Sequence, residues 1–188
     1  MILATNNKGK LREIKKILDD FEIVSLKEYG IDIDVIEDEN TFVGNAIKKA
    51  KEIYEISKEP TIADDSGLCI DIFDDWPGVL THRFLGEDAT DLDRNNAILE
   101  KMKDLIGEDR SAKVVCNLVY YDGNQTIIGE GIINGKIALN RRGSNGFGFD
   151  EIFELDNGKT LAELTPEEKN EISARALAAE DLKRKMKK

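Results

Sequence analysis

Strand-like and helix-like segments alternate along most of the chain, and this alternation limits the folds that it can adopt. The strand-like runs are short and apolar, at residues 1–4, 22–25, 61–63 and 68–72. The helix-like runs repeat apolar residues every three or four positions, first at Leu11, Ile14, Ile17 and Leu18 and then within residues 41–57 and 91–105. Helices interleaved with strands predict an α/β fold in which helices pack on a sheet.

Two longer β-type runs, residues 112–121 and 125–135, are separated only by Asp122-Gly123-Asn124. Asp-Gly at such a junction predicts a hairpin, and a hairpin contributes an antiparallel pair of strands. The sheet is therefore predicted to be mixed and flanked by helices. With 188 residues, the chain fits one domain, residues 1–188, and we expect it to form two lobes with a central cleft.

The last helix has a clear start signal. Thr165 is placed to be its N-cap, Pro166 its first residue and Glu168 the partner that completes a capping box. From there the helix is predicted to continue to about Met186. On a helical wheel with Ile172 at the centre of the buried arc, two basic residues lie at the edges of that arc and Ala174 points away from it; the basic residues are Lys169 and Arg175. They could bind a phosphate or the edge of a purine, but ion pairs with the surplus acids are the default interpretation.

Composition argues against several classes of function. The net charge is -11, and no basic block precedes the last few residues, which disfavours binding to duplex nucleic acid. Cys69 and Cys116 form no C-x-x-C pair, so neither a zinc site nor a disulfide framework is indicated. No apolar run is long enough for a signal sequence or a membrane span. We expect a soluble, cytoplasmic protein that binds a small ligand and neither nucleic acid nor a membrane.

A polar turn joins the first strand to the first helix and has the features of an anion site. It contains two asparagines and a glycine, it opens a helix, and it carries two lysines; its residues are Thr5, Asn6, Asn7, Lys8, Gly9 and Lys10. Backbone N–H groups and the helix dipole attract phosphate at such a position. The P-loop pattern is absent, and a turn without a ligand is the alternative.

Two adjacent lysines in the second helical segment differ in their predicted exposure. Taking 100° per residue from Phe42, Lys49 falls within the buried arc and Lys48 on the solvated face. A lysine on a buried arc either extends its amine to solvent or meets an anion. We predict that Lys49 reaches a carboxylate or a phosphate.

Asp64 and Asp65 follow a strand directly, although adjacent carboxylates repel each other. Magnesium prefers hard oxygen ligands and takes one or two carboxylates from a protein, so Asp64 and Asp65 are candidate ligands and Glu37 could supply a second carboxylate. Because successive strand residues point to opposite sides, we do not expect the two aspartates to share one task, and we expect Asp64 to engage Lys49 or the nearby backbone. A solvated turn is the alternative. The only histidine, His82, supports no catalytic triad.

The segment from Ser144 to Asp150 combines glycines with two aromatic residues and one acid. Glycine lets the backbone approach a ligand, an aromatic ring can stack on a base, and a carboxylate accepts hydrogen bonds. The residues concerned are Phe147, Gly148, Phe149 and Asp150. Phenylalanines that only complete the core are the alternative.

Six blocks in the right order give the chain a resemblance to the inosine triphosphate pyrophosphatase family, the XTP/dITP diphosphatases, over nearly its whole length. The blocks are ATNNKGKLREI, TFVGNAIKKA, IADDSGL, PGVLTHRFLGEDATD, SNGFGFDEIF and LAELTPEEKNEISAR. The resemblance implies an elongated α/β fold that forms a homodimer. It implies hydrolysis of ITP, dITP and XTP between the α and β phosphates with Mg²⁺, which releases pyrophosphate and removes deaminated purines from the nucleotide pool.

The resemblance also assigns roles to residues. It implies that residues 5–10 hold the triphosphate, that Lys49 contacts phosphate or the acids, and that Glu37 and Asp65 hold Mg²⁺ while Asp65 orients or deprotonates the attacking water. Ser66 would touch the substrate. The remaining residues would bind the base, with the two basic ones at its 6-oxo edge: Phe147, Gly148, Phe149, Asp150, Lys169, Ala174 and Arg175.

Three positions depart from the family pattern. Ala174 stands where the family has histidine, so one polar contact to the base is missing. Gly44 replaces a glutamate that would complete a capping box with Thr41, and this should weaken the helix start by about 1 kcal/mol. Glu151 replaces a proline beside the base loop. Because of Ala174, a nucleotide-binding regulator with weak catalysis and a pyrophosphatase with a shifted base preference are the alternative functions.

Overall fold

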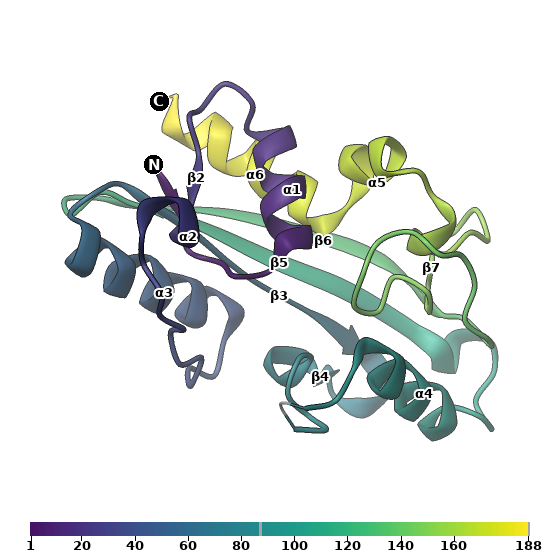
Figure 1. The fold of residues 1–188 in the computed structure, drawn as a ribbon. Coiled ribbons are helices and arrows are strands. Elements are labelled where there is room, and N and C mark those ends of the chain that lie inside the picture. Colours follow the sequence, from purple (N-terminus) through teal and green to yellow (C-terminus); the bar gives the residue numbers. More distant parts are fainter. Residues whose placement is uncertain (87, 188) are drawn as a thin grey trace. The chain divides into compact units, whose positions relative to one another are not determined.

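The computed structural model describes residues 1–86 and 88–187 (Figure 1). Glu87, which belongs to the PGVLTHRFLGEDATD block, lies outside the described residues. The chain divides into two compact units, and the first consists of Met1–Ser66, Val115–Ile132 and Ser173–Lys188. The second unit consists of Gly67–Val114 and Ile133–Ile172. Within the described residues, no helix is long and apolar enough to cross a membrane.

The described strands form one mixed sheet. Their order is β2-β1-β3-β5-β6-β7, and β4 pairs with β3. The bounds are β1 (Ile2–Leu3), β2 (Val24–Ser25), β3 (Thr61–Ile70), β4 (Trp76–Pro77), β5 (Ser111–Tyr121), β6 (Thr126–Ile137) and β7 (Phe153–Glu154). β1 is parallel to β2 and β3, whereas β3–β4 and β6–β7 are antiparallel. A mixed sheet flanked by helices is thus confirmed.

The predicted hairpin is confirmed at the junction of β5 and β6. Asp122 Oδ1 accepts hydrogen bonds from the backbone N–H groups of Asn124 and Gln125, each at 2.9 Å. An aspartate that binds the backbone two and three residues on stabilises a turn. The two strands that leave it are neighbours in the sheet.

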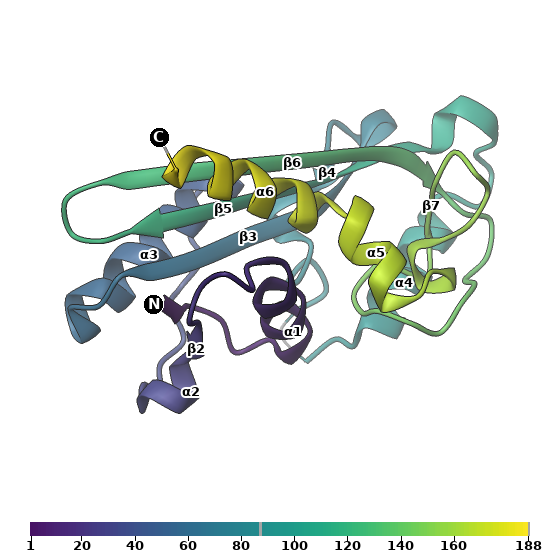
Figure 2. The same cartoon turned by 90° about the horizontal axis from the view of Figure 1, so that it is seen from above.

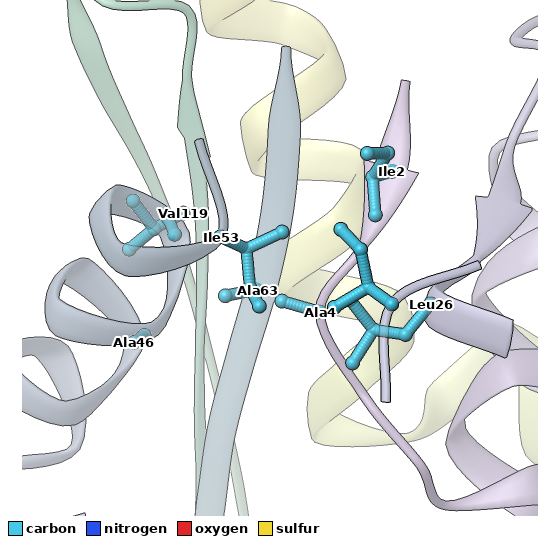
Figure 3. Close-up of a cluster of buried hydrophobic side chains, with 9 residues drawn as sticks. Ile2, Ala4, Leu26, Ala46, Ile53, Ala63 and Val119 are labelled. Atoms are coloured by element: carbon cyan, nitrogen blue, oxygen red, sulfur yellow. The ribbon is translucent and has the colours of Figure 1, made fainter. Parts of the chain in front are cut away.

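The first unit places helices on both faces of its strands. Its helices are α1 (Lys8–Ile17), α2 (Leu26–Tyr29), α3 (Phe42–Ser57) and α6 (Ala174–Met186). An apolar core joins α3 to one face of the sheet, and in Figure 3 the side chains of Ile53 and Ala63 lie next to each other there. The cluster consists of Ile2, Ala4, Leu26, Ile31, Ala46, Ala50, Ile53, Ala63 and Val119. Because side chains alternate along β3, the residues on either side of Ala63 face away from α3.

Thr41 is the N-cap of α3, as the sequence predicts, and its side chain accepts from Gly44 N at 3.0 Å. A Cβ atom at Gly44 would lie 2.9 Å from Thr41 Oγ1 and 3.0 Å from Glu39 Cβ. A glutamate would therefore require these neighbours to shift. The glycine at this position matches the local backbone of this chain.

Helix α6 lies directly on β6, as Figure 2 shows from above. A Cβ atom at Gly129 would be 2.1 Å from the Ala178 carbonyl oxygen, and one at Gly131 would be 2.0 Å from that of Ala174. The two glycines are buried and Glu130 between them is exposed, so both face the helix. Only glycine lets the backbone of α6 approach the strand this closely.

The second unit contains residues 67–70 of β3, 111–114 of β5 and 133–137 of β6. Its helices are η1 (Asp71–Phe73), η2 (Gly78–Leu80), α4 (Asp91–Lys101), η3 (Gly107–Arg110), η4 (Leu161–Glu163) and α5 (Pro166–Ile172). Buried Arg110 joins two of its segments by donating to the carbonyl oxygens of Met102, Ile137 and Ala138, at 2.6, 2.6 and 2.7 Å. A guanidinium bound to carbonyl oxygens satisfies their hydrogen bonding inside the core.

The prediction of one helix from Pro166 to Met186 is wrong. The capping box of Thr165 and Glu168 is present, but the helix ends at Ile172 and Ser173 begins a new one, accepting from Ala176 N at 3.1 Å. The extended backbone of Ser173 resets the helical phase. As a result Ile172 is 39% exposed and Ala174 only 2% exposed, the reverse of the helical-wheel prediction.

The contact between α6 and β6 can be tested with Gly131→Ala. The added methyl group has no room beside the helix backbone, and we expect the free energy of unfolding to fall by about 2 kcal/mol. Chemical denaturation measures it. Asn134→Ala, at an exposed position of the same strand, is the control. Equal effects of the two substitutions would contradict the close approach.

Candidate active site

Asp64 and Asp65 lie in the interior of β3 and not in a turn. The strand is buried along its entire length, with Asp64 0% and Asp65 3% exposed. The solvated-turn alternative is therefore wrong. Because Asp65 points to the same side as Ala63, it faces α3, and Asp64 faces α1 and α6. The hydrogen-bond and ion-pair partners of the two carboxylates agree with their placement on opposite faces of β3.

Asp64 is the anion to which two buried cations bind. Its Oδ2 atom lies 3.1 Å from Lys10 Nζ of α1 and 3.2 Å from Arg175 Nη2 of α6. Burial alone would raise the pKa of Asp64, but the positive charges of Lys10, Arg175 and Lys49 hold it well below its usual value. Asp64 Oδ1 is buried without a hydrogen-bond partner among the described residues. Asp64 thus fixes a lysine and an arginine from two helices at one point.

Asp65 is held by N–H donors at both oxygens. Oδ2 accepts from Asn45 Nδ2 and Oδ1 from its neighbour Ser66 N, each at 2.9 Å. Burial raises the pKa of Asp65 above its usual value; the charge of Lys49 opposes this rise and the charge of Glu37 adds to it. The carboxylate is therefore oriented by the backbone and by α3, in a setting that favours proton uptake.

Lys49 faces inward, as predicted, and is 8% exposed. Its amine lies 2.5 Å from Glu37 Oε1 and 2.5 Å from the backbone carbonyl oxygen of Asp64. Burial disfavours its charged form, but the negative charges of Asp64, Asp65 and Glu37 raise the pKa of Lys49. The expectation that Asp64 engages Lys49 holds for the Asp64 backbone, whereas its carboxylate binds other cations. Lys48 binds the exposed Asp38 at 2.5 Å.

The Thr5–Lys10 turn begins α1 and brings Lys10 to Asp64. Asn7 is the N-cap and its Oδ1 accepts from Gly9 N at 2.8 Å and Lys10 N at 3.2 Å, while Thr5 Oγ1 accepts from Asn7 N at 3.2 Å. Asn6 Nδ2 donates to the Ile33 carbonyl oxygen at 3.3 Å. Lys8 is exposed. The turn therefore has its own capping hydrogen bonds, and a phosphate would meet it beside Lys8 and Lys10.

Arg175 is held by three polar groups of the first unit. It donates to Glu13 Oε2 at 2.6 Å and to Ser66 Oγ at 3.0 Å, besides its bonds to Asp64. Its burial opposes the charge, but Asp64, Cys116 and Glu13 raise the pKa of Arg175. Ser66 therefore touches Arg175, and Ala174 beside it is covered by protein.

Five of the predicted base-binding residues belong to the second unit, whereas Ala174 and Arg175 belong to the first. Asp150 Oδ2 accepts from Lys169 Nζ at 2.5 Å and from Phe147 N at 2.8 Å. The Lys169 amine also lies 4.6 Å from the centre of the Phe147 ring, where a cation is attracted by the ring face. Lys169 and Asp150 are 6% and 3% exposed. Lys169 thus binds a carboxylate within the second unit, and Arg175 binds carboxylates within the first.

Phe149 and Gly148 line a hollow in the second unit. The other lining residues come from the segment after η2 and from α4. The lining residues are Thr81, His82, Phe84, Asp91, Arg94, Asn95, Ile98, Gly148 and Phe149.

Two contributors to the first-unit cluster were missed. Asn45, 0% exposed, lies four residues before Lys49 on the buried arc of α3, and a polar residue on an apolar arc is the signal that could have identified it. Glu13 of α1 binds Arg175 of α6, and the two residues are 162 positions apart in the sequence. No local sequence pattern indicates a contact between such distant residues.

Glu37 and Asp65 are the candidate magnesium ligands. Glu37 raises the pKa of Asp65, so the two negative charges oppose each other, and a bound divalent cation would reduce this repulsion. No group of three or more Asp, Glu, His or Cys side chains in residues 1–86 and 88–187 is arranged to hold a metal. Magnesium needs only one or two carboxylates, because water and substrate phosphates complete its coordination.

This chain is similar to dITP/XTP pyrophosphatases over nearly its whole length. A dITP/XTP pyrophosphatase from Clostridium perfringens is 43% identical over 99% of this chain and 96% of its own length. The dITP/XTP pyrophosphatase of Escherichia coli K12 is 40% identical over 95% and 93%. The solved structure of a HAM1 protein from Coxiella burnetii has a TM-score of 0.89 and 38% identity, and covers 99% of this chain and 97% of that one.

The sequence profile of the Ham1 family matches residues 1–185. The chain therefore belongs to the Ham1 family. The resemblance inferred from the six blocks is confirmed.

The role of Asp64 can be tested with Asp64→Asn. Removing one charge of a buried cluster leaves two cations without their anion, and we expect the free energy of unfolding at pH 7 to fall by about 3 kcal/mol. Since the folded-state pKa of Asp64 is lowered, its contribution is present above the unfolded pKa of about 4 and is lost as the pH falls further. Denaturation of both proteins from pH 7 to pH 3 measures this.

Asp104→Asn, at an exposed position, is the matched control and should not change stability. A deficit in Asp64→Asn that is constant down to pH 3 would contradict the assignment of Asp64 as the charged partner.

Proposed function

We propose that this chain hydrolyses non-standard purine nucleoside triphosphates, namely dITP, XTP and ITP, to the monophosphate and pyrophosphate. The observation that carries the proposal is the cluster of Lys10, Lys49, Asp64, Asp65 and Arg175 around β3, in a chain about 40% identical to dITP/XTP pyrophosphatases over nearly its whole length. Removal of such nucleotides from the precursor pool would be its role.

The first unit supplies the groups that phosphate chemistry needs. Glu37 and Asp65 would hold Mg²⁺, which neutralises phosphate charge and orients phosphate oxygens when it is bound. Lys10 would add positive charge at the turn that begins α1. Lys49, whose charge is secured by three nearby acids, would stabilise charge that develops in the transition state. Pre-placed cations act without reorganising during the reaction, which is the main form of catalysis in phosphoryl transfer.

Asp65 is our candidate for orienting or deprotonating the attacking water. A raised pKa brings the carboxylate closer to the basicity that a general base needs. Asn45 and the Ser66 backbone fix its orientation, so that its remaining lone pairs have a defined direction. Placing a water in line with the scissile bond requires this kind of fixed acceptor.

The second unit supplies groups that suit a 6-oxopurine. The Phe147 ring would stack on the base, and Lys169 would donate to the 6-oxo group. Adenine carries an amino group at this position, which donates where a lysine also donates, so ATP would be disfavoured. Asp150 keeps the Lys169 amine in place at 2.5 Å.

Ala174 favours one alternative within the same chemistry, a pyrophosphatase with a shifted base preference. Its methyl group offers no hydrogen bond where the family has histidine. Comparing turnover of ITP with that of dUTP and dTTP decides between the two. Tight binding of ITP without release of pyrophosphate would instead indicate a nucleotide-binding regulator. The cytoplasmic location and the homodimer stay predictions.

Asp65→Asn is the sharpest test of the proposed function. The amide cannot take a proton and binds Mg²⁺ poorly, so we expect pyrophosphate release from ITP, dITP and XTP to fall at least a hundredfold. Turnover by the unaltered chain should also stop when EDTA removes the metal. Coupled pyrophosphate detection measures both, and circular dichroism checks the fold.

Asp104→Asn again serves as the control and should retain full activity. Full activity of Asp65→Asn would refute its role. Release of orthophosphate in place of pyrophosphate by the unaltered chain would refute the proposed reaction.

A further inference from the structure

The peptide groups of Gly148 are held at both ends by side chains of one helix. Gly148 N donates to Asp91 Oδ2 at 2.7 Å, and the Gly148 carbonyl oxygen accepts from Asn95 Nδ2 at 2.9 Å. All three residues belong to the second unit. Gly148 lies between Phe147 and Phe149 in the loop that would hold the base, so the helix contacts that loop at its central residue.

The spacing of the two side chains explains why they meet one residue. Asp91 and Asn95 are four residues apart in α4, and residues at this spacing lie on the same face of a helix. Thr90 caps the helix and forms a capping box with Asp93, which defines the first turn where Asp91 stands. The contact is therefore built on a regular, capped helix.

The chemistry of each contact allows only one orientation. A backbone N–H can only donate, so Asp91 suits it as an acceptor. A carbonyl oxygen can only accept, so the Asn95 amide must present its nitrogen. Asn95 is 2% exposed, and a buried amide held in this way is costly to replace with a group that cannot donate.

Gly148 needs such support because its own backbone is permissive. Its φ is +65°, in the left-handed region, and a Cβ atom there would meet nothing within 4 Å. Glycine moves between left- and right-handed conformations at little cost, so local sterics do not fix this peptide. Asp150 holds the neighbouring Phe147 N–H from within the loop. Asp91 and Asn95 supply the fixation from outside it.

We propose that Asp91 and Asn95 are positioning residues that set the Gly148 peptide and thereby place Phe147 and Asp150 for recognition of the purine base. The inference rests on the proposed function for the base loop. It assigns a contribution to base selectivity to α4, a helix that carries none of the residues expected to touch the substrate.

The test uses Asn95→Asp, which keeps size and shape but turns a donor toward the Gly148 carbonyl into a repelling oxygen. We expect KM for ITP to rise about tenfold, the scale of one lost hydrogen bond, with kcat changed less than twofold and the preference for ITP over ATP reduced. Asn96→Asp, the exposed neighbour on the same helix, is the matched control and should keep the unaltered values.

A second variant, Asp91→Ala, is measured without any substrate. It removes the acceptor of the Gly148 N–H, so hydrogen exchange of this amide should become at least tenfold faster while amides of β3 keep their rates. Because Asp91 is at the exposed start of the helix, this variant keeps the inference testable if Asn95→Asp does not fold.

The outcomes separate this inference from the proposed function. Faster exchange at Gly148 with unchanged KM and unchanged preference for ITP over ATP would overturn the positioning role, as would unchanged exchange in Asp91→Ala. If the unaltered chain does not hydrolyse ITP, the proposed reaction is wrong. Calorimetry then measures the affinity of the two variants for ITP, which tests the placement of the base loop without turnover. Unchanged affinity would then overturn it.

Discussion

The rest of the first unit depends on the ion pairs of the buried Asp64 carboxylate with Lys10 and Arg175. An ionised group with no exposure is stable only if cations meet it, and here they come from α1 and α6. Lys10, at the start of α1, and Arg175, at the start of α6, are thereby fixed relative to β3. The two glycines of β6 allow the backbone of α6 to lie close enough for Arg175 to reach. Helix packing and the charge cluster thus constrain each other.

The two adjacent carboxylates of β3 have different partners: Asp64 binds cations that hold two helices in place, and Asp65 is the candidate catalytic residue. Strand alternation sends Asp64 to the face of α1 and α6, where cations bind its Oδ2 atom and lower its pKa. It sends Asp65 to the face of α3, where an amide and a backbone N–H orient it and burial raises its pKa. One residue of displacement along a strand thus gives two carboxylates opposite electrostatic settings. Lys49 contacts both residues' surroundings, because its amine donates to the Asp64 carbonyl oxygen and to Glu37.

Much of this arrangement could be predicted from the sequence, where local patterns carry it. The apolar periodicity of α3 predicted that Lys49 faces inward, and Thr41 and Thr165 predicted where two helices begin. The Asp-Gly junction predicted the hairpin. The partners of Arg175 could not be found, because Ser173 interrupts the last helix and a helical wheel loses its phase at a break. Asn45 was missed because periodicity counts apolar residues. Contacts between distant segments, such as Arg175 with Glu13, leave no local pattern.

The charge cluster also has a consequence for the time course of folding. Arg175 and Asp64 are 111 residues apart, and Arg175 and Glu13 are 162 apart. Closing such long loops costs entropy before the contact stabilises the fold, so we expect these ion pairs to form late in folding. During synthesis, Asp64 leaves the ribosome long before Arg175, and until then only Lys10 and Lys49 are available among the cations that lower its pKa in the folded chain. The nascent chain therefore cannot assemble the complete cluster, and a partly made protein lacks the arrangement on which nucleotide hydrolysis would depend.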